Sequence, residues 1–320
     1  MTIAAAQSSL ALGVDVGGTA SRWLLLDMDA REIAHGDGPG FSGAELLSPA
    51  GAARVARCVA ELAHGVHARL QASESSAPAQ LGAVYAGVTG IGAGSAALQA
   101  LFADAFALPA PAVQVVSDIQ IAYRAAFAPG ESYLVYAGTG SIAAFIDDTG
   151  SLHRAGGRGV LLDDAGGGYW MAREVLRRIW RREDELPGAW RQSPLAQRLF
   201  TAVGGDSSIF SARFLMERDR GEVGRLAVHL IDCADRDALA REILNDAGAE
   251  LARLANAMIA RYGVRPVVIA GRAALMHPLT RQAARARIVE RVTVDWRMLE
   301  AHVAAAKCAV EKLRAMEYKK

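Results

Sequence analysis

The stretch LGVDVGGTASRWLLLD, residues 12–27, decides the fold of this chain. It consists of an apolar strand, a tight turn and a second apolar strand, which predicts a β-hairpin. Gly17 and Gly18 have no Cβ, so their backbone N–H groups can converge on an anion, and the hydroxyl of Thr19 adds a further donor. The turn is a candidate phosphate-binding loop, although an ordinary hairpin with a Gly-Gly turn has the same local pattern.

A second stretch, YLVYAGTGSIAAFID at residues 133–147, repeats this order of strand, Gly/Thr turn, strand and Asp. Its turn contains Gly138, Thr139, Gly140 and Ser141, which supply amides and hydroxyls but no acid. The two hairpins lie about 120 residues apart, which predicts an internal duplication in which each copy contributes one phosphate-facing turn.

Asp118 lies between the two hairpins. The strand-like segment AVQVVSD ends at this residue, and IQIAYRAAF, which has helical spacing, follows it directly. Open α/β sheets place their chemistry at the carboxyl ends of strands, so Asp118 is a candidate catalytic acid or base. A simple helix N-cap remains the alternative on local evidence.

The composition limits the classes of function. A chain of 320 residues with 52% hydrophobic and 22% charged residues is long enough for two domains. The net charge of +1 gives no electrostatic reason to expect nucleic acid or an anionic membrane as partner. No lysine precedes Lys307, so a lysine-containing P-loop is excluded, and phosphate chemistry must use amides, hydroxyls and metal.

The cysteines and the N-terminal segment favour a cytoplasmic protein. Cys58, Cys233 and Cys308 are odd in number, far apart in the sequence and set in apolar helical patterns, as is typical of reduced thiols. The N-terminal segment has no basic region before its apolar run, so we expect no signal peptide. No apolar run approaches the roughly 18 residues of a membrane span.

The remaining segments predict a regular α/β alternation. We expect a third strand that ends near His35, a helix over residues 52–70, and helical structure through most of residues 190–262. A strand over residues 266–270 leads into Gly271, and the tail from Trp296 onward is predicted to be an alanine-rich helix.

Taken in order, these motifs resemble the BadF/BadG/BcrA/BcrD-type ATPase family, and within it the N-acetylglucosamine kinases. The resemblance rests on GVDVGGTASRWLLLD, VVSDIQIAYRAAF, YLVYAGTGSIAAFID, GGRGVLLDDAGGGYWMAREVL and VVIAGRAALMHPL, which span nearly the whole chain. It implies an α/β fold of the sugar kinase/actin/Hsp70 superfamily, with two ribonuclease-H-like domains around a central cleft. The implied domains are residues 1–118, with a helix at about 300–320 packing back on them, and residues 119–299.

The resemblance also implies roles for individual residues. ATP phosphates would be held by the two turns (Asp15, Gly17, Gly18, Thr19; Gly138, Thr139, Gly140, Ser141), with Asp15 near Mg²⁺ through water. Gly271 and Arg272 would form the adenosine turn. Asp118 would be the general base, and the acceptor sugar would contact Ser42, Asp118, Thr139, Gly140 and Asp164.

The chain departs from the family pattern at several of these positions. The family reads GDEGSGYW where this chain has DDAGGGYW, so Ala165 replaces a glutamate and Gly167 a serine. The sugar-binding asparagine after the third strand is replaced by Phe41 and Ser42, and Arg272 occupies the second glycine position of the adenosine turn.

The predicted function is an ATP-dependent kinase that acts on an amino sugar such as N-acetylglucosamine or glucosamine, and the resemblance suggests a homodimer. Two alternatives share the fold. One is a relative that binds nucleotide or sugar without turnover. The other is an ATPase activator of a dehydratase or reductase, which needs cysteines for an iron–sulfur cluster, and the three cysteines lack that spacing.

Overall fold

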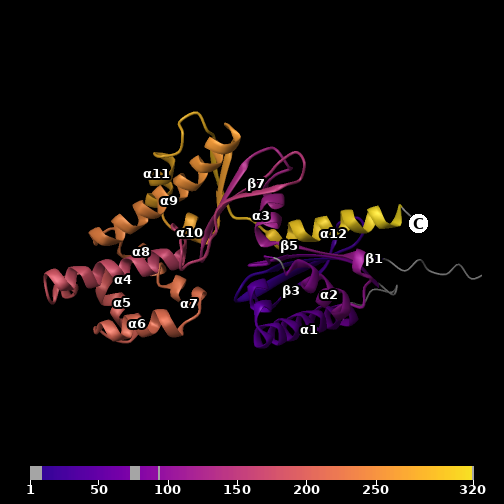
Figure 1. Ribbon diagram of the computed structural model, residues 1–320, viewed down its shortest axis with the longest axis horizontal. Helices are drawn as coiled ribbons and strands as arrows, with labels where there is room; N and C mark the ends of the chain where they lie inside the picture. The colour runs from indigo at the N-terminus through magenta and orange to yellow at the C-terminus, as the bar shows by residue number, and fades with distance from the viewer. Residues whose placement is uncertain (1–8, 73–79, 93, 319–320) are drawn as a thin grey trace, which may run out of the picture. The chain divides into compact units, whose positions relative to one another are not determined.

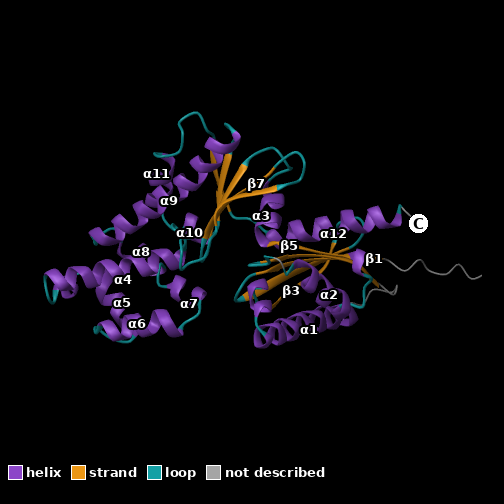
Figure 2. Ribbon diagram, viewed as in Figure 1, coloured by secondary structure: helices purple, strands orange, loops and turns teal. Residues whose placement is uncertain are grey.

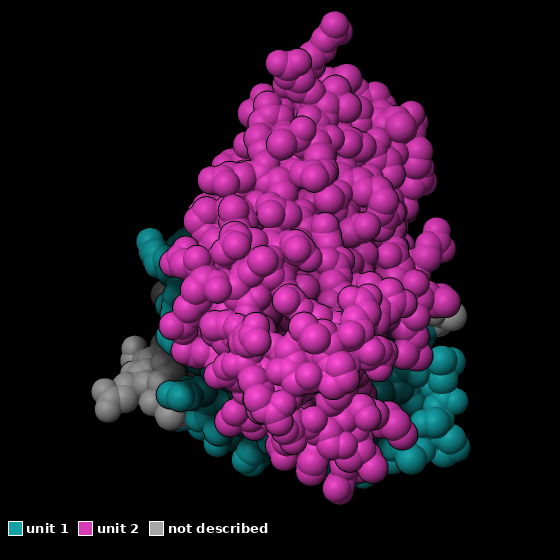
Figure 3. Space-filling view, turned by 90° about the vertical axis from the view of Figure 1, so that its left-hand side faces the viewer, with its two compact units in different colours: residues 1–126, 300–320 teal, residues 127–299 magenta. Residues whose placement is uncertain are grey.

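A computed structural model describes residues 9–72, 80–92 and 94–318 of the chain. The sequence predicts no signal peptide at the N-terminus, and most of that segment lies outside the described residues. The chain forms two compact units, coloured separately in Figure 3. One contains the chain up to Ala126 together with Glu300–Lys320, and the other is Phe127–Leu299. The first unit includes all of helix α3, which ends at Ala126. The sequence-based boundary of 118 falls at the first residue of that helix.

The first unit contains a five-stranded sheet with strand order β3-β2-β1-β4-β5. Figure 2 shows its strands in orange, with helices in purple around them. Strands β1, β2 and β3 are antiparallel neighbours, whereas β4 and β5 run parallel to β1. The strands are β1 (Ser9–Val16), β2 (Ala20–Leu26), β3 (Glu32–Pro39), β4 (Gln80–Val88) and β5 (Val113–Ser117). The helices are η1 (Gly43–Leu47), α1 (Pro49–Ala72), α2 (Ser95–Ala105), η2 (Ala110–Ala112), α3 (Asp118–Ala126) and α12 (Ala301–Glu317).

Helices cover both faces of this sheet (Figure 1). Because successive strand residues point to opposite faces, Leu12 and Val14 of β1 pack in one core cluster with residues of α1 and α2. Ala11 points the other way and packs against α12. The central strand β1 is therefore buried on both sides, as its apolar sequence predicts.

The second unit repeats the same sheet, with strand order β10-β9-β6-β7-β8. Strands β6, β7 and β8 are antiparallel neighbours, and β9 and β10 continue parallel to β6. These strands are β6 (Tyr133–Ala137), β7 (Ser141–Ile146), β8 (Leu152–Gly156), β9 (Val267–Ala270) and β10 (Val294–Arg297). The identical topology confirms the predicted duplication and the α/β fold class.

The helices of the second unit include a group between β8 and β9 that has no counterpart in the first. Long helix α9 packs on β6, β7 and β8, and α11 packs on α9. The helices are α4 (Gly168–Glu185), η3 (Ala189–Gln192), α5 (Pro194–Val203), α6 (Ser208–Glu217), α7 (Arg220–Arg225), α8 (Val228–Cys233), α9 (Ala238–Tyr262), α10 (Arg272–Leu275) and α11 (Pro278–Arg285).

Two sequence-based boundaries are wrong. Strand β3 continues beyond His35 to Pro39, which an edge strand tolerates because one side of it has no partner strand. Trp296 lies in edge strand β10, and helix α12 begins only at Ala301. Among the described residues, no helix is both long and apolar enough to cross a membrane.

Candidate active site

Asp15 lies near the carboxyl end of β1, in the middle of a row of residues that crosses the sheet. It pairs in register with Arg22 of β2 on one side and with Gly87 of β4 on the other. Residues in register on neighbouring strands point to the same face of a sheet. The side chains of Asp15 and Arg22 therefore lie on the same face of the sheet. On that face Gly87, which has no side chain, lies beside Asp15.

Asp118 approaches this row from helix α3. It follows the last residue of β5 and is the first residue of α3, as the sequence predicts. A Cβ added at Gly87 would overlap the end of Ile121 and would lie 3.3 Å from the Asp118 Cα. Gly87 thus lets the first turn of α3 close onto the sheet beside the row that contains Asp15.

The two carboxylates interact electrostatically. Burial and the charge of Asp118 raise the pKa of Asp15 to about 6, against a smaller lowering by Arg22. The Asp118 carboxylate accepts a hydrogen bond of 2.8 Å from the backbone N–H of Ile119. Two carboxylates on one face, of which one is hard to ionise, form an arrangement suited to proton transfer and to cation binding.

The donor set is compatible with Mg²⁺. This ion prefers oxygen ligands, keeps several waters, and is bound in proteins through one or two carboxylates together with substrate phosphates. The described residues contain no group of three or more His, Cys, Asp or Glu side chains that could hold a metal unaided. Asp15, with Asp118 nearby, is the carboxylate that would contact a hydrated Mg²⁺, so phosphate oxygens would have to complete the site.

The first glycine turn joins β1 to β2 at the same end of the sheet. The Gly17 N–H donates to the Ala20 carbonyl at 3.0 Å and closes the hairpin, while Thr19 at its tip is exposed. The Gly17 carbonyl accepts a hydrogen bond of 3.0 Å from the Phe41 N–H. Unit 1 therefore brings this turn, Asp15 and Asp118 to the carboxyl end of β1.

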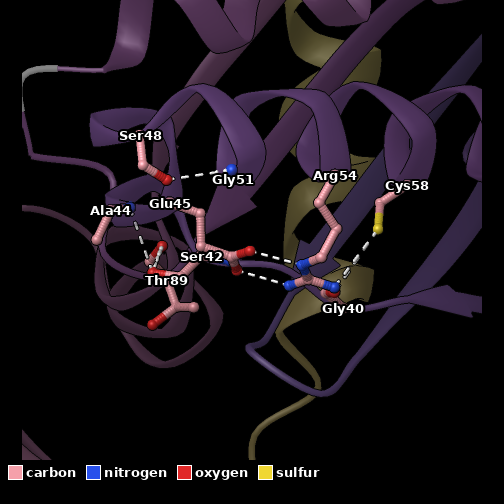
Figure 4. Close-up of polar contacts among 9 residues, drawn as sticks. All are labelled: Gly40, Ser42, Ala44, Glu45, Ser48, Gly51, Arg54, Cys58 and Thr89. Carbon is pink, nitrogen blue, oxygen red and sulfur yellow. Dashed lines mark hydrogen bonds and ion pairs between the residues drawn. The ribbon is translucent and has the colours of Figure 1, made fainter.

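Ser42 has a structural role in the segment after β3 (Figure 4). Its hydroxyl caps the 3₁₀-helix η1 by accepting from the Ala44 N–H at 3.3 Å, and it donates to the Thr89 carbonyl at 3.4 Å. The Ser42 side chain is buried, and the neighbouring Phe41 is fully buried in the core. Its predicted contact with an acceptor sugar stays a prediction.

The second glycine turn, residues 138–141 of unit 2, is held by the first turn of α4. The carbonyls of Gly138 and Thr139 accept from the N–H groups of Gly168 and Tyr169 at 2.9 and 3.0 Å. The buried Ser141 hydroxyl donates to the Ala165 carbonyl at 2.6 Å. The exposed Thr139 thus carries the hydroxyl of this turn that faces solvent.

Asp164 lies directly against the same turn. Its carboxylate accepts from the Gly159 N–H at 3.0 Å, and a Cβ added at Gly140 would overlap it. Burial raises the pKa of Asp164 above its ordinary value. A Cβ at Gly167 would lie 2.6 Å from the Gly140 carbonyl carbon, so in this chain the turn occupies space that the family's serine would need.

Gly271 brings the start of α10 against the end of β6. Its φ of 98° favours glycine, and an added Cβ would lie 2.7 Å from the Ala137 carbonyl carbon. Arg272 follows as the first residue of α10, and its side chain is exposed. Unit 2 therefore gathers the second turn, Asp164 and Gly271 at one end of its sheet.

Sequence reasoning did not single out Arg22 or Gly87. A signal for Arg22 was present, because a two-residue hairpin turn at Gly18 and Thr19 places Arg22 opposite Asp15. Gly87 has no such local signal, because its role depends on β1 and α3, which are distant from it in the sequence.

The profile of the BadF/BadG/BcrA/BcrD ATPase family matches residues 12–306. The chain belongs to this family. Its sequence therefore confirms the resemblance inferred from the motifs. No protein of curated function matches the sequence significantly.

Several solved structures whose names describe sugar kinases share the fold. A protein from Chromobacterium violaceum assigned as N-acetylglucosamine kinase is 22% identical, with a TM-score of 0.68 and coverage of 95% of this chain and 98% of that chain. A Porphyromonas gingivalis protein with the same assignment is 14% identical, with a TM-score of 0.73 and coverage of 94% and 99%. The ROK-family glucokinase of Streptomyces griseus, solved with glucose and AMPPNP, is 14% identical, with a TM-score of 0.52 and coverage of 94% and 99%.

Proposed function

We propose that this chain transfers the γ-phosphoryl group of ATP to a hydroxyl of an amino sugar. The observation that carries the proposal is the pair of carboxylates, Asp15 and Asp118, placed on one face of the sheet in a member of an ATPase family. Support for the nucleotide comes from the family and from two glycine turns, one in each unit, at matching positions of a duplicated fold.

Each residue has a definite task in this reaction. The acceptor hydroxyl oxygen forms a bond to the γ-phosphorus as the bond to the leaving β-phosphate oxygen breaks, and Asp118 takes the hydroxyl proton. The amides of Gly18 and Thr19 and the hydroxyls of Thr19 and Thr139 bind phosphate oxygens, while the Gly17 N–H closes the hairpin. Asp15 would hold Mg²⁺ through water, and the bound ion would neutralise negative charge on the phosphates.

The acceptor is proposed as an amino sugar because the N-acetylglucosamine kinase assignment recurs among the structural relatives. The test measures ADP release with Mg²⁺ and ATP in the presence of glucosamine, N-acetylglucosamine, N-acetylmuramic acid or glucose. We expect phosphorylation of at least one of the amino sugars. Nucleotide binding without phosphorylation of any sugar would instead favour a relative that binds ligands without turnover.

The role of Asp118 has its own test. We expect Asp118→Asn to lower kcat by at least about 100-fold, the range typical of a lost general base, while the Kd for ATP changes by less than about threefold. Turnover at the wild-type rate would remove Asp118 from the role of base. Asp104→Asn, which makes the same change at an exposed carboxylate on α2, is the matched control, with activity expected close to that of wild type.

A further inference from the structure

Residues 40–45, which follow β3, lie between the first glycine turn and helix α1. On the turn side, a Cβ added at Gly40 would overlap the Ala20 N and would lie 2.6 Å from the Gly17 carbonyl oxygen. The neighbouring Phe41 N–H donates to that carbonyl at 3.0 Å. The backbone of the turn therefore rests on Gly40 and Phe41, and its position depends on theirs.

On the helix side, Arg54 of α1 holds the same segment by three hydrogen bonds (Figure 4). Its Nε and Nη2 donate to the two oxygens of Glu45 at 2.6 Å each. Its Nη1 donates to the Gly40 carbonyl at 3.2 Å. Glu45 in turn accepts from the Ser42 N–H at 2.9 Å, so one guanidinium fixes both ends of the segment.

This contact contributes little to global stability. The side chains of Arg54 and Glu45 are 42% and 28% exposed, and ion pairs of this exposure contribute at most about 1 kcal/mol. Its geometric effect is larger, because the planar fork of arginine fixes direction as well as distance. Arg54 is the group that ties the segment supporting the first turn to the rigid helix.

We propose that Arg54 is a positioning residue that holds the first glycine turn in its nucleotide-binding geometry through Gly40 and Phe41. This inference rests on the proposed binding of nucleotide phosphates by that turn. This role requires no contact between Arg54 and nucleotide or acceptor. We expect removal of the Arg54 side chain to weaken the binding of nucleotide, because a displaced turn misaligns the amides that bind phosphate.

The test compares Arg54→Met and Arg54→Lys with the control Arg57→Met, which removes an exposed arginine from the same helix. Calorimetry with Mg²⁺·ATP gives the Kd, and thermal unfolding gives the stability. We expect the Kd to rise about 10-fold for Arg54→Met and about threefold for Arg54→Lys, which keeps the charge but loses the fork. Arg57→Met should bind as wild type does, and all three midpoints should fall by less than about 4 °C.

Hydrogen exchange of the peptide containing residues 15–24 provides a readout that does not need nucleotide. We expect faster exchange of this peptide in Arg54→Met and no change in Arg57→Met. Unchanged exchange and affinity in Arg54→Met would overturn the proposal, as would an affinity loss matched by general unfolding. If wild type binds no Mg²⁺·ATP, the proposed function fails, and the exchange measurement alone decides the structural role of Arg54.

Discussion

At the scale of single residues, the central feature is that the folded protein disfavours the charged form of the Asp15 carboxyl group. Burial and the charge of Asp118 raise its pKa to about 6, well above the value of an unfolded chain. A raised carboxylate pKa means that the folded protein binds the proton more tightly than the unfolded one. Protonated Asp15 therefore stabilises the fold relative to charged Asp15. This contribution is fully present below about pH 4 and is lost as the pH rises through about 6.

The variant Asp15→Asn tests how much the charge on Asp15 destabilises the folded protein. At pH 8 the wild type carries a charge that the fold disfavours, so we expect the variant to be more stable by about 1–3 kcal/mol. Near pH 4 the advantage should vanish, because the wild-type carboxyl is then protonated in the folded state. Urea unfolding at the two pH values measures both differences. A gain of equal size at both values would contradict a raised pKa.

At the scale of elements, the contact between β4 and α3 places Asp118. It depends on Gly87, where an added Cβ would overlap the fully buried Ile121 and would press on the Asp118 backbone. Because Ile121 is fully buried and protein interiors are closely packed, we expect part of the strain to reach the first turn of α3.

Substitution of Gly87 by Ala tests this contact. We expect Gly87→Ala to destabilise the chain by about 1–3 kcal/mol through overpacking and to lower kcat because Asp118 moves. Gly65→Ala is the matched control, since an added Cβ on that helical glycine has open space around it. That change should leave activity intact and stabilise by about 0.5–1 kcal/mol. Unfolding curves and kcat for both variants check the pair, and full activity in Gly87→Ala would refute the contact's role.

The elements also show how far sequence patterns reach. The hairpins and helix α1 have strong periodicity and were predicted correctly apart from their ends. Strand β10 has only four residues, and its edge position leaves half of them exposed, so it has no apolar run to distinguish it from the helix that follows. Pro39 can be part of β3 because that strand lies at an edge of the sheet, where one side of it has no partner strand.

At the scale of the whole molecule, the first unit is discontinuous in sequence. Helix α12 comes from the end of the chain and covers a face of the first sheet, where Ala306, Val310 and Leu313 pack against Ala11 and Leu24. The second unit is a single continuous segment with its own sheet and helices.

This organisation predicts how fragments behave. Residues 127–299 alone should give a cooperative unfolding transition by circular dichroism, because their core is complete. Residues 1–126 alone should not, because one face of their sheet loses its apolar cover. Fusion of residues 300–320 to that fragment through a flexible linker should restore the transition. Cooperative folding of residues 1–126 without α12 would contradict this view.

The sequence by itself determined the two hairpins with their glycine turns, the duplication and the position of Asp118 after a strand, because each depends on spacing within a short segment. Only the tertiary structure decided that Asp118 lies beside Asp15 across Gly87, that Arg54 bonds the segment next to the first turn, and that α12 begins at Ala301 rather than near Trp296. These features arise from packing between segments far apart in the chain, where strand register and the fit of side chains set the geometry. The opening stretch therefore supplies the turn and the acid, and the fold supplies the second carboxylate and the support of the turn.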